Sequence, residues 1–409
     1  MDAVSHTHWW RDATPEAKRA LAAASLGWML DAFDVMLYAL VLTSLIGDLG
    51  ITRRTAGLLG SLTLVASAAG GVAFGVVADR YGRTRALMAS ILVYSVFTAA
   101  CGMAQTLTQL AVFRFLLGLG MGGEWASGAA LVSETWPDRD RGKAMGVMQS
   151  SWAIGYAAAA LVTGLVLPRF GWRAVFFTGL LPALLTFWVR RHVEEPALWR
   201  RAAAAPRPSV ARIFEPPFLR VTVALTLMNA CTMFAYWGFN LWVPAYFALS
   251  PARGGVGLTP AGMSSLVALM QVGTWLGYVA FGFASDAFGR KRTYVTYLVA
   301  AAGLLAAFTL TRSPAVLIVL GPMAAFFGAG YFSGFGAVSA ELFPTAIRAS
   351  AQGLTYNAGR LASAVAPLLV GSLADARGFG VAFTTATVAF LAAALFWAWI
   401  PETRGRSLT

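Results

Sequence analysis

The chain has few charged residues and few cysteines for its length. Charged side chains make up 12% of its 409 residues, against a usual share of about 25% in soluble proteins. That shortage excludes a disordered chain, a coiled coil and an ordinary soluble enzyme. The two cysteines, Cys101 and Cys231, lie in apolar stretches, where unpaired packing residues are expected rather than a disulfide. Hydrophobic residues reach 58%, which indicates a polytopic membrane protein.

Motifs of catalysis and cofactor binding are also missing. The absence of a phosphate-binding Gly-Lys-Ser/Thr loop argues against transport driven by ATP. Gly118-Leu-Gly-Met-Gly-Gly123 matches a dinucleotide pattern, but it lies inside an apolar run, so close helix packing explains it better. No metal-ligand spacing and no catalytic constellation occur. We therefore expect neither an enzyme nor a bound metal or cofactor.

Apolar runs of about 20 residues, the length that crosses a bilayer, are present along the whole chain. They predict an all-α membrane protein with twelve transmembrane helices. An Arg- and Pro-rich linker, 190–217, separates six spans in 1–189 from six in 218–409. The expected spans are 20–46, 57–78, 86–105, 109–133, 144–167, 172–189, 218–248, 261–284, 293–311, 314–340, 349–373 and 379–400.

The distribution of Lys and Arg predicts the orientation in the membrane. The N-terminus, the even-to-odd loops, the linker and the C-terminus together hold 22 of the 31 basic residues, and the opposite loops hold seven. Cytoplasmic loops carry such an excess. We expect both termini in the cytoplasm and the protein in the cytoplasmic (inner) membrane. The net charge of +13 is then a topology signal and not a nucleic-acid-binding surface.

The two halves of the chain repeat at a constant offset of 207 residues. Gly75-Val-Val-Ala-Asp79-Arg-Tyr-Gly-Arg83 recurs as Gly282-Phe-Ala-Ser-Asp286-Ala-Phe-Gly-Arg290. The same offset relates further pairs in two other loops, namely Glu134 and Glu341, Pro137 and Pro344, Arg141 and Arg348, and Glu195 and Glu402. One offset over three loops predicts two six-helix bundles related by a pseudo-twofold axis along the membrane normal.

These motifs resemble those of the major facilitator superfamily over essentially the whole chain. The Gly-x-x-x-Asp-Arg-x-Gly-Arg pattern is that superfamily's hallmark. Glu341-Leu-Phe-Pro-Thr-Ala-Ile-Arg348 is similar to a loop of sugar porters and metabolite:proton symporters. Trp28-Met-Leu-Asp31-Ala-Phe-Asp34 and Tyr356-Asn-Ala-Gly-Arg360 are most similar to carboxylate:proton symporters of the sialic-acid and lactate type.

The loop residues have two interpretations. We expect Asp79 and Asp286 to start spans 3 and 9, where a carboxylate caps free N–H groups. Topology and capping alone would account for them. The resemblance implies in addition a cytoplasmic gate, in which charge–dipole contacts hold the halves together while the pocket faces outwards. The gate residues would be Asp79, Arg83, Asp286, Arg290, Glu134, Arg141, Glu341 and Arg348.

Charges inside the membrane each cost about 2.5–3.5 kcal/mol on insertion scales, so each is a functional candidate. Asp31 and Asp34 share a face of span 1, and Arg114 on span 4 reaches the same depth as Asp34. We expect Asp34, assisted by Asp31, to carry the coupled proton and Arg114 to tune it. A permanent structural ion pair is the alternative. Glu124 on span 4 is either a second proton acceptor or a structural partner.

Arg360, near the middle of span 11, breaks the repeat, because its counterpart is Ala153. Spans 7 to 12 contain no acid to neutralise it, and a guanidinium fork fits a carboxylate. We expect it to anchor the substrate's carboxylate, unless backbone carbonyls, Asp31 or Glu124 satisfy it. Other polar or aromatic residues expected to shape the pocket are Asn357, Tyr331, Asn229, Tyr236, Asn240, Gln271, Gln149 and Trp152.

The favoured function is proton-coupled symport of a small organic acid by alternating access, with the protein working as a monomer. Lactate, pyruvate and sialic-acid-like substrates all remain open. A sugar or neutral-solute porter is the main alternative. A drug:proton antiporter fits less well, because Ala159 and Ala160 replace the Gly-Pro that such proteins carry in span 5. The three histidines lie outside the spans, so carboxylates would have to carry the proton.

Overall fold

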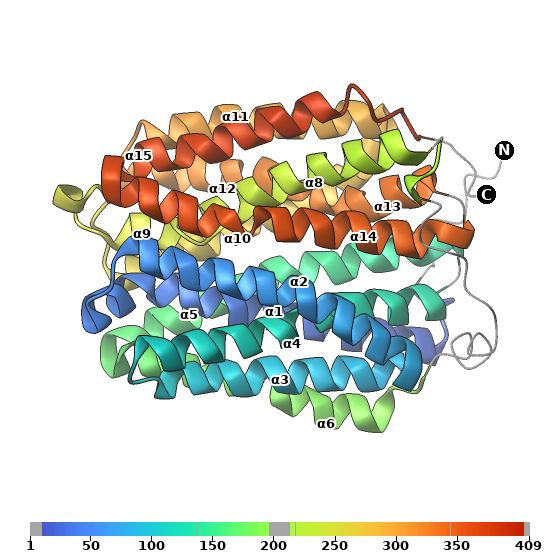
Figure 1. Ribbon diagram of the computed structural model, residues 1–409, viewed down its shortest axis with the longest axis horizontal. Helices are drawn as coiled ribbons and strands as arrows, with labels where there is room; N and C mark the ends of the chain where they lie inside the picture. Colours follow the sequence, from blue (N-terminus) through green and yellow to red (C-terminus); the bar gives the residue numbers. More distant parts are fainter. Residues whose placement is uncertain (1–9, 137, 196–212, 217, 344, 405–409) are drawn as a thin grey trace.

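The computed structural model describes residues 10–136, 138–195, 213–216, 218–343 and 345–404. All regular secondary structure in these ranges is helical. The helices form two elongated groups that lie side by side, one from each half of the chain (Figure 1). Cys101 and Cys231 are unpaired, as expected.

The first group runs from α1 to α6. Long apolar segments form these helices, and threonine caps start three of them: the Thr14, Thr52 and Thr106 hydroxyls accept N–H bonds in the first turns of α1, α2 and α4. The elements are α1 (Pro15–Leu49), α2 (Arg53–Tyr81), α3 (Arg83–Met103), α4 (Leu107–Thr135), α5 (Asp138–Phe177), η1 (Thr178–Leu180) and α6 (Ala183–His192).

The second group repeats this order with more interruptions. Tyr331 and Ala364 mark breaks in the tenth and eleventh spans. The elements are α8 (Phe218–Asn240), α9 (Val243–Ala248), η3 (Pro251–Arg253), α10 (Pro260–Phe288), α11 (Arg290–Thr309), α12 (Pro314–Gly330), α13 (Phe332–Leu342), α14 (Thr345–Ser363) and α15 (Val365–Phe396).

Ten segments of the described chain are long and apolar enough to span a membrane. Two of them, Lys143–His192 and Ala351–Phe396, contain 50 and 46 residues. At about 1.5 Å per residue these are roughly twice as long as a 30 Å hydrocarbon core requires. Each therefore crosses twice, which gives the twelve predicted helices.

Glycines at equivalent positions reverse the chain in both halves. Gly171 in α5 (φ 76°) and Gly378 in α15 (φ 82°) have left-handed backbone conformations where the chain turns between two spans. Gly82 and Gly289, at φ 120° and 98°, separate α2 from α3 and α10 from α11. Side chains with a Cβ rarely adopt such angles. The two glycines of each pair are 207 residues apart, so the sequence repeat is also a structural repeat.

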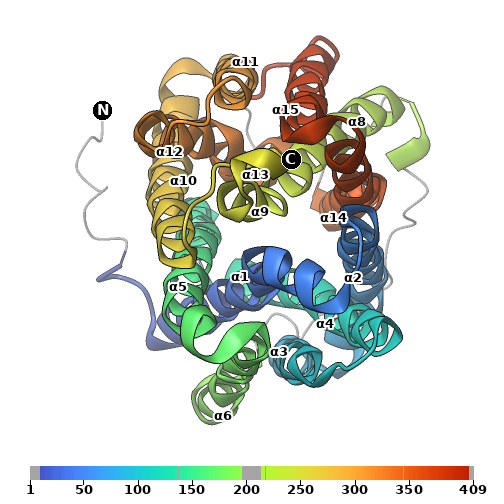
Figure 2. The same cartoon turned by 90° about the vertical axis from the view of Figure 1, so that its left-hand side faces the viewer.

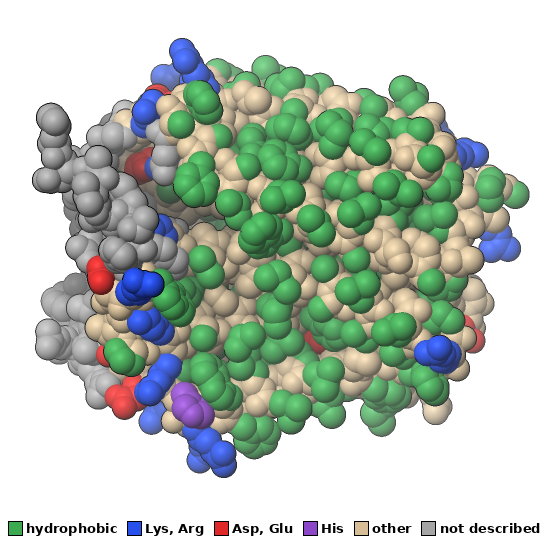
Figure 3. Space-filling model, turned by 180° about the vertical axis from the view of Figure 1, so that it is seen from behind, with side chains coloured by type: hydrophobic (Ala, Val, Ile, Leu, Met, Phe, Trp, Pro, Cys, Tyr) green, Lys and Arg blue, Asp and Glu red, His purple; other side chains and the backbone are tan. Residues whose placement is uncertain are grey.

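On the face seen in Figure 3, hydrophobic side chains cover the middle of the molecule, and the charged ones gather towards its two ends. This is the surface expected for a protein in a bilayer. We call the end that carries Arg83, Glu195, Arg290 and Glu402 the linker end, and the opposite end, with Arg53 and Asp375, the far end. Viewed along the long axis, α3 and α6 lie on the outer side of the first group, and α11 lies on the outer side of the second (Figure 2).

Candidate functional site

A cavity lies between the two halves, and most of its wall is aromatic. Trp152 bridges the halves, because its Nε1 donates to the Tyr236 hydroxyl at 2.7 Å. The Trp152 ring also packs on Trp28, with centroids 4.6 Å apart. A flat apolar wall with a few placed polar groups is typical of small-molecule sites. The lining residues are Trp28, Gln149, Trp152, Met233, Tyr236, Trp237, Tyr278, Phe332, Tyr356 and Arg360.

Arg360 is the one charged residue among those that line this cavity. Its side chain is buried, and its Nη1 donates to the Ser67 hydroxyl on α2 at 2.9 Å. The guanidinium lies 5.3 Å from the centroid of the Tyr356 ring. Its Nε has no hydrogen-bond partner among the described residues. A buried donor without a partner is costly, so this group is suited to receiving an anion.

Asp31 and Glu124 belong to the N-terminal half of the protein, and both interact electrostatically with Arg360 of the C-terminal half. Both are buried, and Asp31 Oδ2 and the two Glu124 oxygens have no hydrogen-bond partner in the described chain. The acids that interact with Arg360 in this way belong to the other half of the chain, which is the arrangement that the sequence left open as an alternative.

The expected contact between Asp34 and Arg114 is not formed. Arg114 lies over the Tyr38 ring, 4.0 Å from its centroid, and no hydrogen bond or ion pair joins it to Asp34 within the described residues. Asp34 instead faces α3 and η1, beside Thr98 and Gly179. Residues at one depth in the membrane meet only if their helix faces also agree.

Of the other polar residues predicted for the pocket, Gln149, Trp152 and Tyr236 line the cavity and Asn240 lines a neighbouring one. Tyr331 and Asn357, the two best candidates, do not line the central cavity. The Tyr331 hydroxyl donates to Thr232 O and the Asn357 amide to Gly353 O. Asn229 ties α8 to α14 through Thr355 O and Tyr356 O, and Gln271 is buried outside the lining.

Sequence reasoning missed part of the aromatic wall. Trp28 and Tyr356 stood within the motifs of the resemblance but were not assigned to the pocket, and Tyr278 and Phe332 were not singled out. Aromatic residues occur in every span of this chain. Only their helix faces select the ones that meet at the centre, and apolar periodicity does not report faces in helices surrounded by lipid and protein.

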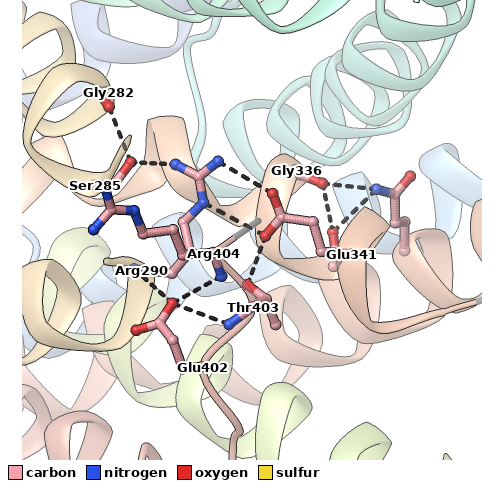
Figure 4. Close-up of polar contacts among 10 residues, drawn as sticks. Gly282, Ser285, Arg290, Gly336, Glu341, Glu402, Thr403 and Arg404 are labelled. Atoms are coloured by element: carbon pink, nitrogen blue, oxygen red, sulfur yellow. Dashed lines mark hydrogen bonds and ion pairs between the residues drawn. The ribbon is translucent and has the colours of Figure 1, made fainter. Parts of the chain in front are cut away.

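Matched ion pairs occupy the linker end of each half. Arg83 bonds Glu134 at 3.0 Å, and 207 residues later Arg290 bonds Glu341 at 3.1 Å. Arg290 also donates to the Ser285 hydroxyl, and Thr403 reaches the same Glu341 (Figure 4). Four of the residues expected in a cytoplasmic gate are thus paired within their own halves. The side chains of Asp79, Asp286, Arg141 and Arg348 lie outside the described residues.

The expectation that Asp79 and Asp286 start the next helices is wrong. Both belong to the last turns of α2 and α10, because these helices continue to the glycine breaks. Glutamates distant in sequence cap α3 and α11 instead. Glu195 accepts the Thr84 and Arg85 N–H groups, and Glu402 accepts those of Arg290 and Lys291.

Glu402 also accepts the N–H groups of Thr403 and Arg404 (Figure 4). Partial burial raises the pKa of Glu402, but the four backbone N–H groups outweigh it and hold that pKa below its ordinary value. The carboxylate is therefore ionised at neutral pH and complements the positive end of α11.

The two halves are joined at the far end. Arg53 at the start of α2 donates to Ala374 O at 2.8 Å and to Arg253 O at 3.1 Å, and its Nε lies 3.6 Å from Asp375. The other oxygen of Asp375 accepts the Arg54 N–H. These contacts connect α2 with α15 and with the loop before α10.

Comparisons with known proteins agree with this architecture. Residues 24–255 and 246–408 match the model of the Major Facilitator Superfamily. The chain is 33% identical to the sialic acid transporter NanX of Escherichia coli, covering 94% of each chain. It is 31% identical to the cis,cis-muconate transport protein of Acinetobacter baylyi, covering 91% of each.

Among solved structures, the xylose transporter XylE of E. coli, in a partially occluded inward-open conformation, has the same fold. Its TM-score is 0.79 at 19% identity, with 97% of this chain and 100% of that chain covered. The family match spans both six-helix groups and nearly the whole sequence. The chain therefore belongs to the Major Facilitator Superfamily, and it is an integral membrane transporter and not an enzyme.

Proposed function

We propose that this transporter carries a small organic acid together with a proton, by alternating access between its two halves. The observation that carries the proposal is Arg360, a buried guanidinium with a free donor facing a cavity between the halves. A carboxylate is the anion that its planar fork fits best. Two relatives of similar length are named for the transport of acids, sialic acid and muconate.

The residues of the cavity wall favour one class of acid as the substrate. The indole and phenol rings of the wall present apolar faces and meet one another at an angle. The Trp28 and Trp152 centroids, for example, are 4.6 Å apart and their planes are tilted by 44°. Such walls favour flat rings or conjugated chains, which bury their faces without losing conformational freedom. We therefore place planar carboxylates, such as benzoate or muconate, ahead of lactate, pyruvate and sialic-acid-like substrates.

The proton would be handled by the buried acids of the first half. Asp31, Asp34 and Glu124 all lie inside the membrane, and every one has at least one oxygen without a hydrogen-bond partner in the described chain. Keeping such a carboxylate ionised in a dry site is costly, so protonation is favoured there. Arg114, lying against Tyr38, would set the local charge around Asp34.

Orientation follows from the positive excess at the linker end. We propose that this end faces the cytoplasm, in the inner membrane of a bacterium, and that one monomer is sufficient for transport. The far-end contacts of Arg53 then close the cavity towards the outside. The linker-end pairs Arg83–Glu134 and Arg290–Glu341 would act in the cytoplasmic gate.

One observation favours the alternative of a neutral solute. Asp31 and Glu124 interact electrostatically with Arg360, and an ionised carboxylate among them would offset its charge without an anionic guest. Uptake into proteoliposomes under an imposed pH gradient decides between the two. We expect accumulation of benzoate or muconate and none of xylose, with Arg360→Ala liposomes reporting passive entry. Uptake of neutral sugars without uptake of any acid would overturn the proposal.

A further inference from the structure

A second cavity lies within the C-terminal half of the protein, beside the central one, and we call it the side cavity. Its described lining residues belong to α8, α10, α11, α12 and α15, so the first half contributes none of them. Tyr236 lines both cavities, whereas Arg360 lines only the central one. The two spaces therefore adjoin at Tyr236.

Small residues provide the space in the side cavity. They are Ala235, Ala301, Ala324, Ala325, Gly328 and Ala329. A Cβ added at Gly328 would meet the Phe390 ring at 3.7 Å, an ordinary van der Waals distance, and no other neighbouring part of the described chain within 4 Å. Phe390 also lines the side cavity. One more methyl group therefore fits at this position without a clash, which is independent support for free space there.

The side cavity is apolar in character. Two of its polar side chains, Asn240 and Thr274, donate to backbone oxygens one turn earlier in their own helices, at Tyr236 O and Met270 O. No charged side chain occurs among the described residues that line it. A buried water needs about two to four polar partners, so apolar cavities stay dry and bind apolar guests. The side cavity is therefore suited to a hydrocarbon group.

Tyr236, at the boundary of the two cavities, is held from both halves of the protein. Trp152 of the first half donates to its hydroxyl at 2.7 Å. Trp237 and Phe332 of the second half meet its ring edge to face, with centroids 5.6 and 5.3 Å away. In the proposed alternating access the halves move relative to each other, so the bond to Trp152 joins two moving bodies. The position of Tyr236 therefore depends on the state of the transporter.

On the basis of the proposed function, we propose that the side cavity is a subsite for a small apolar substituent of the substrate, entered past Tyr236. An aromatic acid whose carboxylate binds Arg360 places its ring between the aromatic walls of the central cavity. A methyl group at the end of the ring remote from the carboxylate then passes Tyr236 and contacts the alanines of the side cavity. Aromatic acids with a short alkyl group are therefore preferred over the unsubstituted ring.

Binding of two ligands that differ by one methyl group tests this subsite. Benzoate and 4-methylbenzoate are titrated into purified protein, and tryptophan fluorescence reports occupancy of the central cavity. Burial of one methyl group in an apolar space should lower the Kd of 4-methylbenzoate about fourfold relative to benzoate. Gly328→Ala, which fills part of the side cavity, should reduce that preference to below about twofold. The ratio of two Kd values within one variant does not depend on the fraction of protein that is folded.

Two further variants complete the comparison. Ala325→Val fills the side cavity from another position and should also reduce the preference, so the test does not depend on one variant. Gly303→Ala, on α11 and outside the lining, adds a Cβ that meets nothing within 4 Å, and it should keep the preference of wild type.

Three results would overturn the inference while leaving acid transport intact: equal Kd values in wild type, a preference that survives both filled variants, or its loss in Gly303→Ala. A wild type that binds neither acid would contradict the proposed function itself.

Discussion

Arg360 is the residue on which the proposed recognition of a carboxylate substrate depends. Its charge was visible in the sequence, because it has no counterpart in the first half, whereas its acidic neighbours come from the other half of the chain. Helix faces were not visible, and for this reason Tyr331 and Asn357 were expected in the pocket and instead bond backbone oxygens. The expected contact between Asp34 and Arg114 is not formed, for the same reason.

Replacing Arg360 with lysine or alanine distinguishes the effect of its positive charge from that of its planar guanidinium. Arg360→Lys keeps the positive charge but loses the planar fork and the bond to Ser67. Charge-assisted hydrogen bonds contribute about 1.5–3 kcal/mol, so benzoate affinity measured by fluorescence titration should fall by roughly tenfold or more. Arg360→Ala should bind more weakly still. Unchanged affinity in both variants would remove Arg360 from the site.

Among the elements, close helix packing depends on glycines that adjoin backbone. A Cβ on Gly122 of α4 would collide with the Ser67 carbonyl on α2, next to the hydroxyl that Arg360 bonds. Gly122→Ala should therefore lower the melting temperature in detergent and weaken benzoate binding. Gly146→Ala, where a Cβ meets nothing within 4 Å, is the matched control. It should be neutral or gain up to about 1 kcal/mol from helix propensity. Equal stability of the two variants would contradict this packing.

The cap on α11 predicts a dependence of stability on pH. Since the pKa of Glu402 is lowered in the folded protein, its contribution is present above the ordinary glutamate value and is lost as the pH falls through the folded value. Glu402→Gln should lower the melting temperature at neutral pH and lose less stability than wild type on acidification. The side chain is mostly exposed, so the change should be about 1 kcal/mol or less. Parallel melting curves for variant and wild type across that range would contradict the cap.

The long apolar runs and the repeat predicted the helices and their grouping well, because both signals are local or recur at one offset. The caps of α3 and α11 were not predicted. Glu195 and Glu402 are more than 100 residues from the N–H groups that they bind, and the repeat showed only that the two positions correspond. Asp79 and Asp286 were assigned to these helix starts because the expected spans ended at residues 78 and 284, a few residues before α2 and α10 end.

For the whole molecule, alternating access requires the far end to open. Arg53 joins the halves there through Ala374, Arg253 and Asp375. Arg53→Ala removes these bonds and should favour the outward-open state. Labelling of a cysteine introduced at Ser61, which accepts the Leu368 N–H across the same boundary, should then become faster from the far side. An unchanged labelling rate would show that other contacts keep this end closed.

Coupling of acid and proton in one transport cycle is the central claim, and one flux measurement tests it directly. Proteoliposomes with an internal pH indicator and no initial pH gradient receive benzoate outside, beside matched liposomes with Arg360→Ala that report passive diffusion of the acid. We predict that wild-type liposomes acidify inside faster than the variant, by close to one proton for each benzoate carried. Wild-type benzoate uptake that exceeds the variant's without any additional acidification would contradict the account.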